Sequence, residues 1–216
     1  ESFIILSDFK EKTIWSNSAC NLVDMGEDVF GFHWNTKMNS IGGEVLQGLN
    51  KAIQLSEEKS KGLVIANDGN LFSAGANVGM IFMLAIEQDY EELDMAIRAF
   101  QNSMMRVRYS SIPVVTAPHG LCLGGGCEMN LHADAITAAA ETYIGLVELG
   151  IGVIPGGGGT KELVLRASDE MHSEEPETIT LKNRFLQIAT AKVATSAQEA
   201  MEMGILRKGA DEIVLN

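Results

Sequence analysis

Two glutamates stand beside runs of glycine, and this pairing is the feature of the sequence best suited to chemistry. Glu128 ends "GGGCE", and Glu148 lies in the apolar stretch "IGLVELGIG", shortly before "PGGGGTKEL". A carboxylate in such a stretch is expected to be partly buried, and burial without a partner raises its pKa. A carboxyl group that titrates near neutral pH can give or take a proton. We therefore interpret Glu128 and Glu148 as one catalytic pair.

The glycines before Glu128 predict a turn from a buried strand into a helix. The strand is "IPVVTAP" (112–118), and the helix is expected to begin near Gly125. Helix N-termini expose unpaired N–H groups, and glycine lets a ligand atom approach them closely. Such a site suits a developing negative oxygen. The alternative is that these glycines only allow close packing of the helix on the strand.

Nucleotide-binding loops fit these glycines poorly. Gly120 and Gly124 are too widely spaced for G-x-G-x-x-G, and no acidic residue ends a following strand at the right distance. In "PGGGGTKEL", Lys161 follows Thr160 instead of preceding a serine or threonine, so the stretch is not a P-loop.

A metal site is a further interpretation of the same region. Its four candidate ligands are His119, Cys122, Cys127 and His132. Structural zinc sites usually separate their two ligand pairs by roughly 12 residues or more, which this set does not. The sequence therefore predicts no metal.

Composition limits the classes of partner. The chain has 216 residues, enough for one large domain, and 29 acidic against 16 basic residues leave a net charge of −13. This charge disfavours nucleic acid or an anionic membrane as the main partner. No apolar run approaches the roughly 20 residues of a membrane helix. Three cysteines without a secretory signal predict a cytoplasmic protein.

Strand and helix patterns alternate along the chain, which predicts an α/β fold with crossover connections. Strands are expected at 28–35, 61–68, 112–118 and 134–140, and helices at 42–57, 89–108, 160–166 and 195–204. Ser196 and Glu199 have the spacing of a capping box, and Gly204 fits the end of that helix. Residues 1–26 are weakly patterned and are interpreted as a leader or linker. The acidic segment 168–180 is interpreted as a surface loop.

Three motifs carry a resemblance to a known family. They are "FSAGAN" (72–77), "HGLCLGGGCE" (119–128) and "VELGIGVIPGGGGTKEL" (147–163). In this order and at these intervals they resemble the crotonase, or enoyl-CoA hydratase/isomerase, superfamily, from about Val29 to the C-terminus. The resemblance implies a ClpP-like α/β spiral of ββα units over a domain at 27–216, with its C-terminal helices truncated.

The resemblance also implies roles for particular residues. The N–H groups of Ala76 and Gly125 would form an oxyanion hole, and having both Glu128 and Glu148 favours an enoyl-CoA hydratase. No cofactor is implied, since the acyl-CoA substrate itself carries coenzyme A. The residues implied to bind that substrate are Lys37, Ala74, Gly75, Asn77 and Gly124.

The chain departs from the family pattern in several places. Asn77 stands where the family commonly has Asp, and Gly79 where Lys is frequent, so the adenine and phosphate contacts should differ. Segment 168–180 is longer than in compact members. Both ends look cut, which resembles the hydratase portion of a fusion with a 3-hydroxyacyl-CoA dehydrogenase domain in fatty acid β-oxidation. We expect such a piece to turn over enoyl-CoA poorly compared with its longer parent.

Two other functions stay open at this stage. A Δ3,Δ2-enoyl-CoA isomerase would need one carboxylate, Glu148, to shuttle the proton. An acyl-CoA-binding or assembly module would bind the thioester without turnover. A homo-oligomer and a covalent fusion to the dehydrogenase domain are the assemblies that the resemblance allows.

Overall fold

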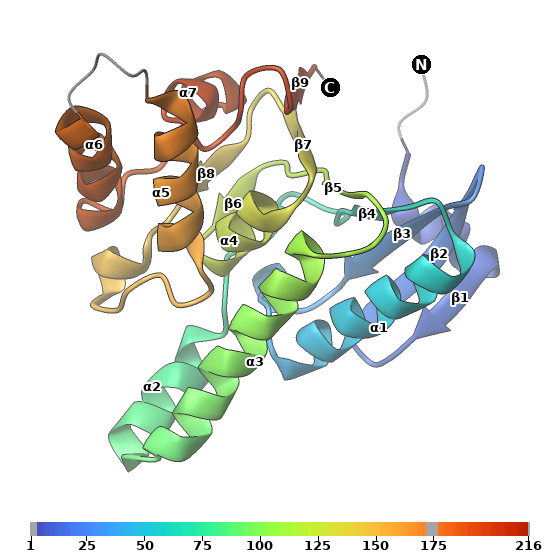
Figure 1. Cartoon of the computed structure of the whole chain (residues 1–216). Coiled ribbons are helices and arrows are strands. Elements are labelled where there is room, and N and C mark those ends of the chain that lie inside the picture. The colour runs from blue at the N-terminus through green and yellow to red at the C-terminus, as the bar shows by residue number, and fades with distance from the viewer. Residues whose placement is uncertain (1–3, 172–176, 216) are drawn as a thin grey trace.

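A seven-stranded sheet forms the centre of the computed structural model, which describes residues 4–171 and 177–215 (Figure 1). Its strands, in spatial order, are β1 (Thr13–Ser16), β2 (Cys20–Gly26), β3 (Val29–Trp34), β4 (Gly62–Ile65), β5 (Val114–Thr116), β7 (Ala135–Ala139) and β9 (Glu212–Val214). The first three strands pair antiparallel, and every pairing from β3 to β9 is parallel. The parallel strands are connected by helical crossovers, as the alternating pattern predicts.

Helices connect the strands of the sheet. They are α1 (Gly43–Lys59), α2 (Val78–Glu87), α3 (Tyr90–Arg108), α4 (Gly125–His132), α5 (Gly159–Glu170), α6 (Glu177–Ala189) and α7 (Ala197–Glu202), with the 3-10 helices η1 (Leu6–Lys12), η2 (Lys37–Asn39) and η3 (Glu148–Ile151). In α1, Val45, Leu49 and Ile53 share one buried face. Within the described ranges, none of the helices is both long enough and apolar enough to cross a membrane.

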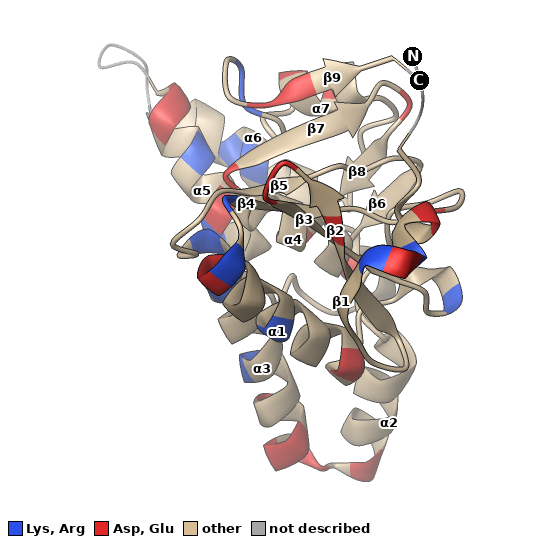
Figure 2. Ribbon diagram, turned by 90° about the vertical axis from the view of Figure 1, so that its right-hand side faces the viewer, with Lys and Arg blue, Asp and Glu red and all other residues tan. Residues whose placement is uncertain are grey.

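The hairpin of α2 and α3 projects from the rest of the molecule (Figure 1). None of the residues of α2 is buried, although Glu87 is its single charged residue, and Figure 2 shows it almost free of charge. In α3 the buried residues Phe100, Met104 and Val107 follow helical spacing. This stripe carries α3 back toward α4, so that Phe100 reaches the beginning of α4.

A smaller parallel sheet positions the two glutamates. It consists of β6 (Leu121–Leu123) and β8 (Tyr143–Gly145). Helix α4 follows β6 directly, and η3 follows β8 after two residues. Because the strands are parallel, the segments that follow them begin at the same end of the sheet. Glu128 and Glu148 are therefore brought to one end of this small sheet.

The expected strands and helices are present in the structure, whereas two segments that were expected to lack them differ. Residues 13–26, interpreted as leader or linker, form β1 and β2, whose buried Leu22 and Val23 belong to the sheet. The expected surface loop at 168–180 is partly helical, since α5 extends to Glu170 and α6 begins at Glu177. The middle of that segment, residues 172–176, lies outside the described residues.

Candidate active site

Glu128 lies in the first turn of α4, on a helix that is buried along its whole length. The chain leaves β6 through Gly124, whose φ of 52° lies in the left-handed region that favours glycine. This turn lets the helix begin immediately after the strand. The side chain of Glu128 is consequently carried into the interior, where the residue is only 3% exposed.

Two backbone N–H groups hold the Glu128 carboxylate. Its Oε1 accepts hydrogen bonds from Gly157 (2.8 Å) and Gly159 (2.9 Å), both in the glycine loop, residues 156–159. Burial raises the pKa of Glu128, and the two N–H donors oppose that rise by stabilising the ionised form. The net direction is upward. Glu128 is therefore a fixed carboxylate that is readier to accept a proton than one in water.

Glu148 is the first residue of η3 and faces the same turn from the other side. A methyl group built on Gly124 would lie 3.2 Å from Glu148 Oε1, so the carboxyl group packs directly on the backbone before α4. Its Oε2 is buried and accepts no hydrogen bond from the described residues. Burial, followed by repulsion from Glu128, raises the pKa of Glu148 to about 7. Near neutral pH this group can both donate and accept a proton.

The raised pKa of Glu148 should also appear in stability. Between about pH 4.5 and 7 the folded chain keeps a proton on Glu148 that the unfolded chain has released, so stability falls as pH rises through this window. Glu148→Gln removes that loss. We compare the free energy of unfolding of the variant with that of the original chain at each pH. The difference should shift in favour of the variant by at most about 3 kcal/mol as the pH rises from acidic to alkaline. Urea unfolding at the two pH values measures this.

The exposed Glu141 supplies the matched control, since Glu141→Gln removes a carboxylate from solvent. That variant should lose stability with pH as the original chain does. A Glu148→Gln variant with the same pH dependence as the original chain would contradict the burial of a titrating Glu148.

Two backbone N–H groups meet beside Glu148, those of Ala76 and Gly125. A methyl group built on Gly125 would lie 3.2 Å from Ala76 N, and one built on Gly75 would lie 3.2 Å from Gly125 N. Gly75 has a φ of +101°, which turns the chain toward α4. No described residue accepts a hydrogen bond from either N–H. Two adjacent free donors at a helix N-terminus are suited to an oxygen that gains negative charge.

The other expected substrate-binding residues lie around this pair. Gly75 and Gly124 form the contact between the segment 73–77 and the beginning of α4. Ala74 donates its N–H to the carbonyl of Met38, which brings the exposed Lys37 to the same segment. Asn77 is exposed, and its Oδ1 caps α2 by accepting from Met80 N at 3.4 Å. The structure thus gathers the three sequence motifs into one region.

Several residues of this region were not expected from the sequence. Gly157 and Gly159 supply the donors to Glu128, and the Phe100 ring lies between the glycine loop and the beginning of α4. Methyl groups built on Gly125 and Gly157 would lie 2.7 and 2.5 Å from that ring. The glycines of both clusters are therefore needed for close packing as well as for any chemistry, so the packing alternative is also supported.

The two histidines among the candidate metal ligands have other partners. His119 Nε2 is 3.0 Å from Gly69 O, and His132 Nδ1 is 2.7 Å from Glu128 O. Cys122 and Cys127 are buried free thiols, as is Cys20. In the part of the chain that the structure describes, no three His, Cys, Asp or Glu residues are placed to hold a metal ion.

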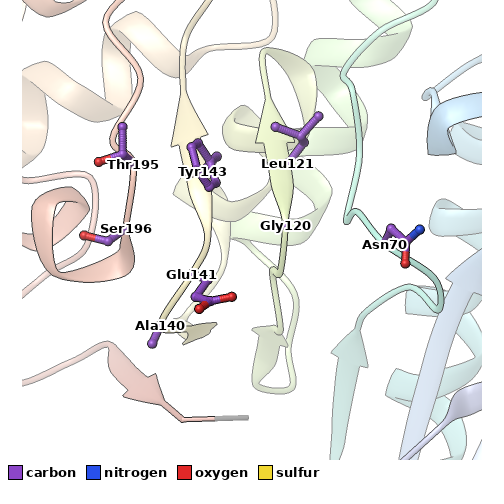
Figure 3. A pocket seen from close by; sticks show the side chains of 8 residues that line it. All are labelled: Asn70, Gly120, Leu121, Ala140, Glu141, Tyr143, Thr195 and Ser196. Carbon is purple, nitrogen blue, oxygen red and sulfur yellow. The ribbon is translucent and has the colours of Figure 1, made fainter.

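A separate pocket of about 600 Å³ opens at the other end of the small sheet (Figure 3). Its lining includes Gly120 and Leu121 at the beginning of β6, Tyr143 at the beginning of β8, and Thr195 shortly before α7. Because the glutamates follow the ends of these strands, the pocket lies away from them. It takes no part in the arrangement described above.

Comparison with known proteins identifies the family. The family model described as "Enoyl-CoA hydratase/isomerase" matches residues 29–214. A protein of Bacillus subtilis (strain 168), described as a probable 3-hydroxyacyl-CoA dehydrogenase, is 46% identical over 203 residues, which are 94% of this chain and 25% of that protein. The chain belongs to the enoyl-CoA hydratase/isomerase, or crotonase, family.

Further relatives agree with this assignment. The fatty acid oxidation complex subunit alpha of Idiomarina loihiensis is 31% identical over 191 residues, covering 87% of this chain and 24% of that subunit. The chain thus spans about a quarter of the length of these two relatives. The crystal structure of an enoyl-CoA hydratase from Bacillus anthracis superposes with a TM-score of 0.74 at 25% identity, covering 92% of this chain and 70% of that one. The crotonase fold expected from the motifs is confirmed.

Proposed function

We propose that this chain catalyses the reversible addition of water across the double bond of a trans-2-enoyl-CoA. The observation that carries the proposal is the meeting of a buried carboxyl group, that of Glu128, and a half-buried one, that of Glu148, with two free N–H groups at one end of the small sheet. An enzyme that adds water to the double bond of an enoyl thioester needs three groups. They are a base that takes a proton from water, an acid that protonates the α-carbon, and hydrogen-bond donors to the enolate oxygen. These residues supply one group for each need.

The proposed mechanism begins with binding of the thioester oxygen. The thioester oxygen accepts hydrogen bonds from the N–H groups of Ala76 and Gly125, which stabilise it as negative charge develops. Glu128 takes a proton from water, whose oxygen forms a bond to C3. Glu148, protonated near neutral pH, delivers its proton to C2. The product is a 3-hydroxyacyl-CoA, and the proton on Glu128 must return to Glu148 through solvent before the next cycle.

We assign substrate contacts to the residues around the N–H pair. The assigned residues are Lys37, Ala74, Gly75, Asn77 and Gly124. The exposed ammonium group of Lys37 is suited to a CoA phosphate. Asn77 is neutral and caps α2, so its contact with the nucleotide would be through hydrogen bonds alone.

The names of the relatives support a role for this reaction in fatty acid oxidation. Two of them are described as a 3-hydroxyacyl-CoA dehydrogenase and as a subunit of a fatty acid oxidation complex. We infer that the chain acts in fatty acid β-oxidation, as part of a polypeptide that also carries a 3-hydroxyacyl-CoA dehydrogenase. Its free thiols suit a reducing compartment, which supports the cytoplasm.

Isomerisation is the second candidate, and one observation favours it. Glu148 has a pKa raised to about 7, and this single carboxyl group could move a proton between C2 and C4 of an enoyl-CoA. Assays with crotonyl-CoA and with a trans-3-enoyl-CoA separate the two reactions. We expect hydration of the first to exceed conversion of the second. Faster conversion of the 3-enoyl substrate would favour the isomerase, and binding without turnover would favour an acyl-CoA-binding module.

A single methyl group at Gly125 tests the oxyanion pair. In Gly125→Ala the methyl group would crowd Phe100 Cζ at 2.7 Å and Ala76 N at 3.2 Å, so the N–H pair should shift. We expect kcat for crotonyl-CoA to fall by about 10²-fold, the usual loss for one misplaced donor. Steady-state kinetics and thermal unfolding measure the two effects.

Gly126→Ala is the matched control, because its methyl group would crowd Ser73 Cβ at 2.9 Å instead. Both variants should lose similar stability. Only Gly125→Ala should show the large fall in kcat, because only its methyl group displaces the N–H pair. Equal kinetic losses in both would show that packing alone explains these glycines.

A further inference from the structure

A buried cluster of ionisable side chains lies directly behind the glycine loop. His132 ends α4 and Glu162 lies in the first turn of α5, and each is 1% exposed. The His132 Nε2 and Glu162 Oε1 atoms are 3.6 Å apart. Lys161 Nζ lies 2.8 Å from Glu162 Oε1, and Arg108 Nη1 lies 3.6 Å from Glu162 Oε2. These two cations compensate the buried carboxylate.

His132 joins this cluster to the catalytic helix. Its Nδ1 lies 2.7 Å from the carbonyl oxygen of Glu128, one helical turn earlier, so Nδ1 must carry the hydrogen and donate it. The Nε2 atom points away from α4 toward Glu162, and it forms no hydrogen bond with any described residue. The hydrogen bond on one side therefore fixes the orientation of the imidazole, and the Glu162 side chain packs against its other nitrogen without a hydrogen bond.

The same imidazole packs against the glycine loop. A methyl group built on Gly158 would lie 3.1 Å from both Cε1 and Nε2 of His132. Glu162 also contacts the loop, since its N–H donates to the Gly158 carbonyl at 3.1 Å. Phe100 packs against the neighbouring residue, Gly157. The loop therefore contacts both the Phe100 ring and the His132 ring.

The held loop supplies the only N–H donors that Glu128 has among the described residues, those of Gly157 and Gly159. A glycine loop without side chains has little packing of its own to fix it. A fully buried histidine with an unpartnered nitrogen is also a costly way to fill space, because an apolar residue would avoid the desolvation penalty. A histidine at position 132 is better explained by its contact with the glycine loop than by filling of space.

We propose that His132, braced by Glu162, is a positioning residue that holds the glycine loop against Glu128 and so orients the Glu128 carboxylate. Its effect on the loop is independent of the reaction. Its effect on turnover rests on the proposed hydration, in which Glu128 activates water.

His132→Asn tests this role. Asparagine can place its amide nitrogen near the Nδ1 position and keep the bond to the Glu128 carbonyl, but it is too short to fill the space of Cε1 and Nε2. We expect hydrogen exchange at the Gly157 and Gly159 amides to become at least about tenfold faster, because the loop opens more often. For crotonyl-CoA, kcat should fall by about tenfold with KM within about twofold.

His33→Asn is the matched control, since it removes another buried imidazole, 8% exposed, from β3. It should leave exchange at the Gly157 and Gly159 amides unchanged. Glu162→Gln keeps the volume of the side chain beside His132 but loses the ion pairs with Lys161 and Arg108 that hold it there, and it should speed exchange at the same two amides by about threefold. This variant decides the matter if His132→Asn does not fold.

The outcomes separate the two claims. Unchanged exchange at Gly157 and Gly159 in a folded His132→Asn chain, or in Glu162→Gln where the first does not fold, would overturn the positioning role. Faster exchange at these amides, in a chain whose original form does not hydrate crotonyl-CoA, would support the positioning role and overturn the proposed reaction. Faster exchange together with a tenfold lower kcat would support both.

Discussion

Glu128→Gln is expected to lower kcat for crotonyl-CoA hydration by about 10³-fold, within the range typical of a lost general base. The amide has the shape of the carboxylate, and its oxygen can still accept the N–H groups of Gly157 and Gly159 at the Oε1 position. The other oxygen is replaced by an NH2 group, which cannot take a proton from water. Catalysis should therefore be lost without loss of the loop geometry.

Binding of the thioester should persist in this variant, because Glu128 is not among the residues assigned to hold it. Steady-state kinetics and calorimetric titration with a non-reactive acyl-CoA measure the two properties. Glu141→Gln, at an exposed site away from the pair, should behave as the original chain does. Near-normal hydration by Glu128→Gln would show that another group activates water.

Glu148→Gln should also lower kcat for hydration by about 10³-fold, and it should affect exchange of the C2 hydrogen as well. The Glu148 carboxyl group is the one that packs on Gly124, beside the N–H pair, and its pKa of about 7 allows it to exchange protons with the substrate. Its loss should slow both hydration and exchange of the C2 hydrogen with solvent by about this factor. Proton NMR of a saturated acyl-CoA incubated in deuterated water measures the exchange directly.

Comparison of the two glutamine variants tests the division of labour. Glu128→Gln should retain part of the C2 exchange, because the acid at C2 and the N–H pair remain. Equal loss of exchange in both variants would mean that the carboxyl groups titrate and act as one coupled unit. The repulsion between Glu128 and Glu148, which contributes to the raised pKa of Glu148, makes this a real alternative.

The buried strands could be predicted from sequence because their residues form apolar runs that the sheet buries. β3, β4, β5 and β7 lie inside the expected ranges. β6 and β8 were not expected, since each has three residues and is next to glycine, too short for any periodic pattern. Helix α2 was also not expected, because it is apolar on all sides and has no polar face to define a period.

Part of the candidate site could likewise be predicted from the sequence and part could not. Local composition identified Glu128, Glu148 and both glycine clusters, because ionisable groups in apolar, glycine-rich stretches are conspicuous in a sequence. The contacts that tune them could not be identified locally. Gly157 and Gly159 are 29 and 31 residues from Glu128, and Phe100 reaches the loop from a third element. His132 was considered only as a metal ligand, since its contact with Gly158 exists only in the folded chain.

The most direct test of the proposed reaction is hydration of crotonyl-CoA by this chain in deuterated water, with mass and NMR analysis of the product. The arrangement of Glu128, Glu148 and the Ala76–Gly125 N–H pair predicts 3-hydroxybutyryl-CoA with one deuterium at C2, delivered by Glu148. It predicts that the labelled product forms about 10³-fold more slowly in Glu148→Gln. Bound but unchanged crotonyl-CoA, or a labelled product formed equally well by Glu148→Gln, would contradict the account.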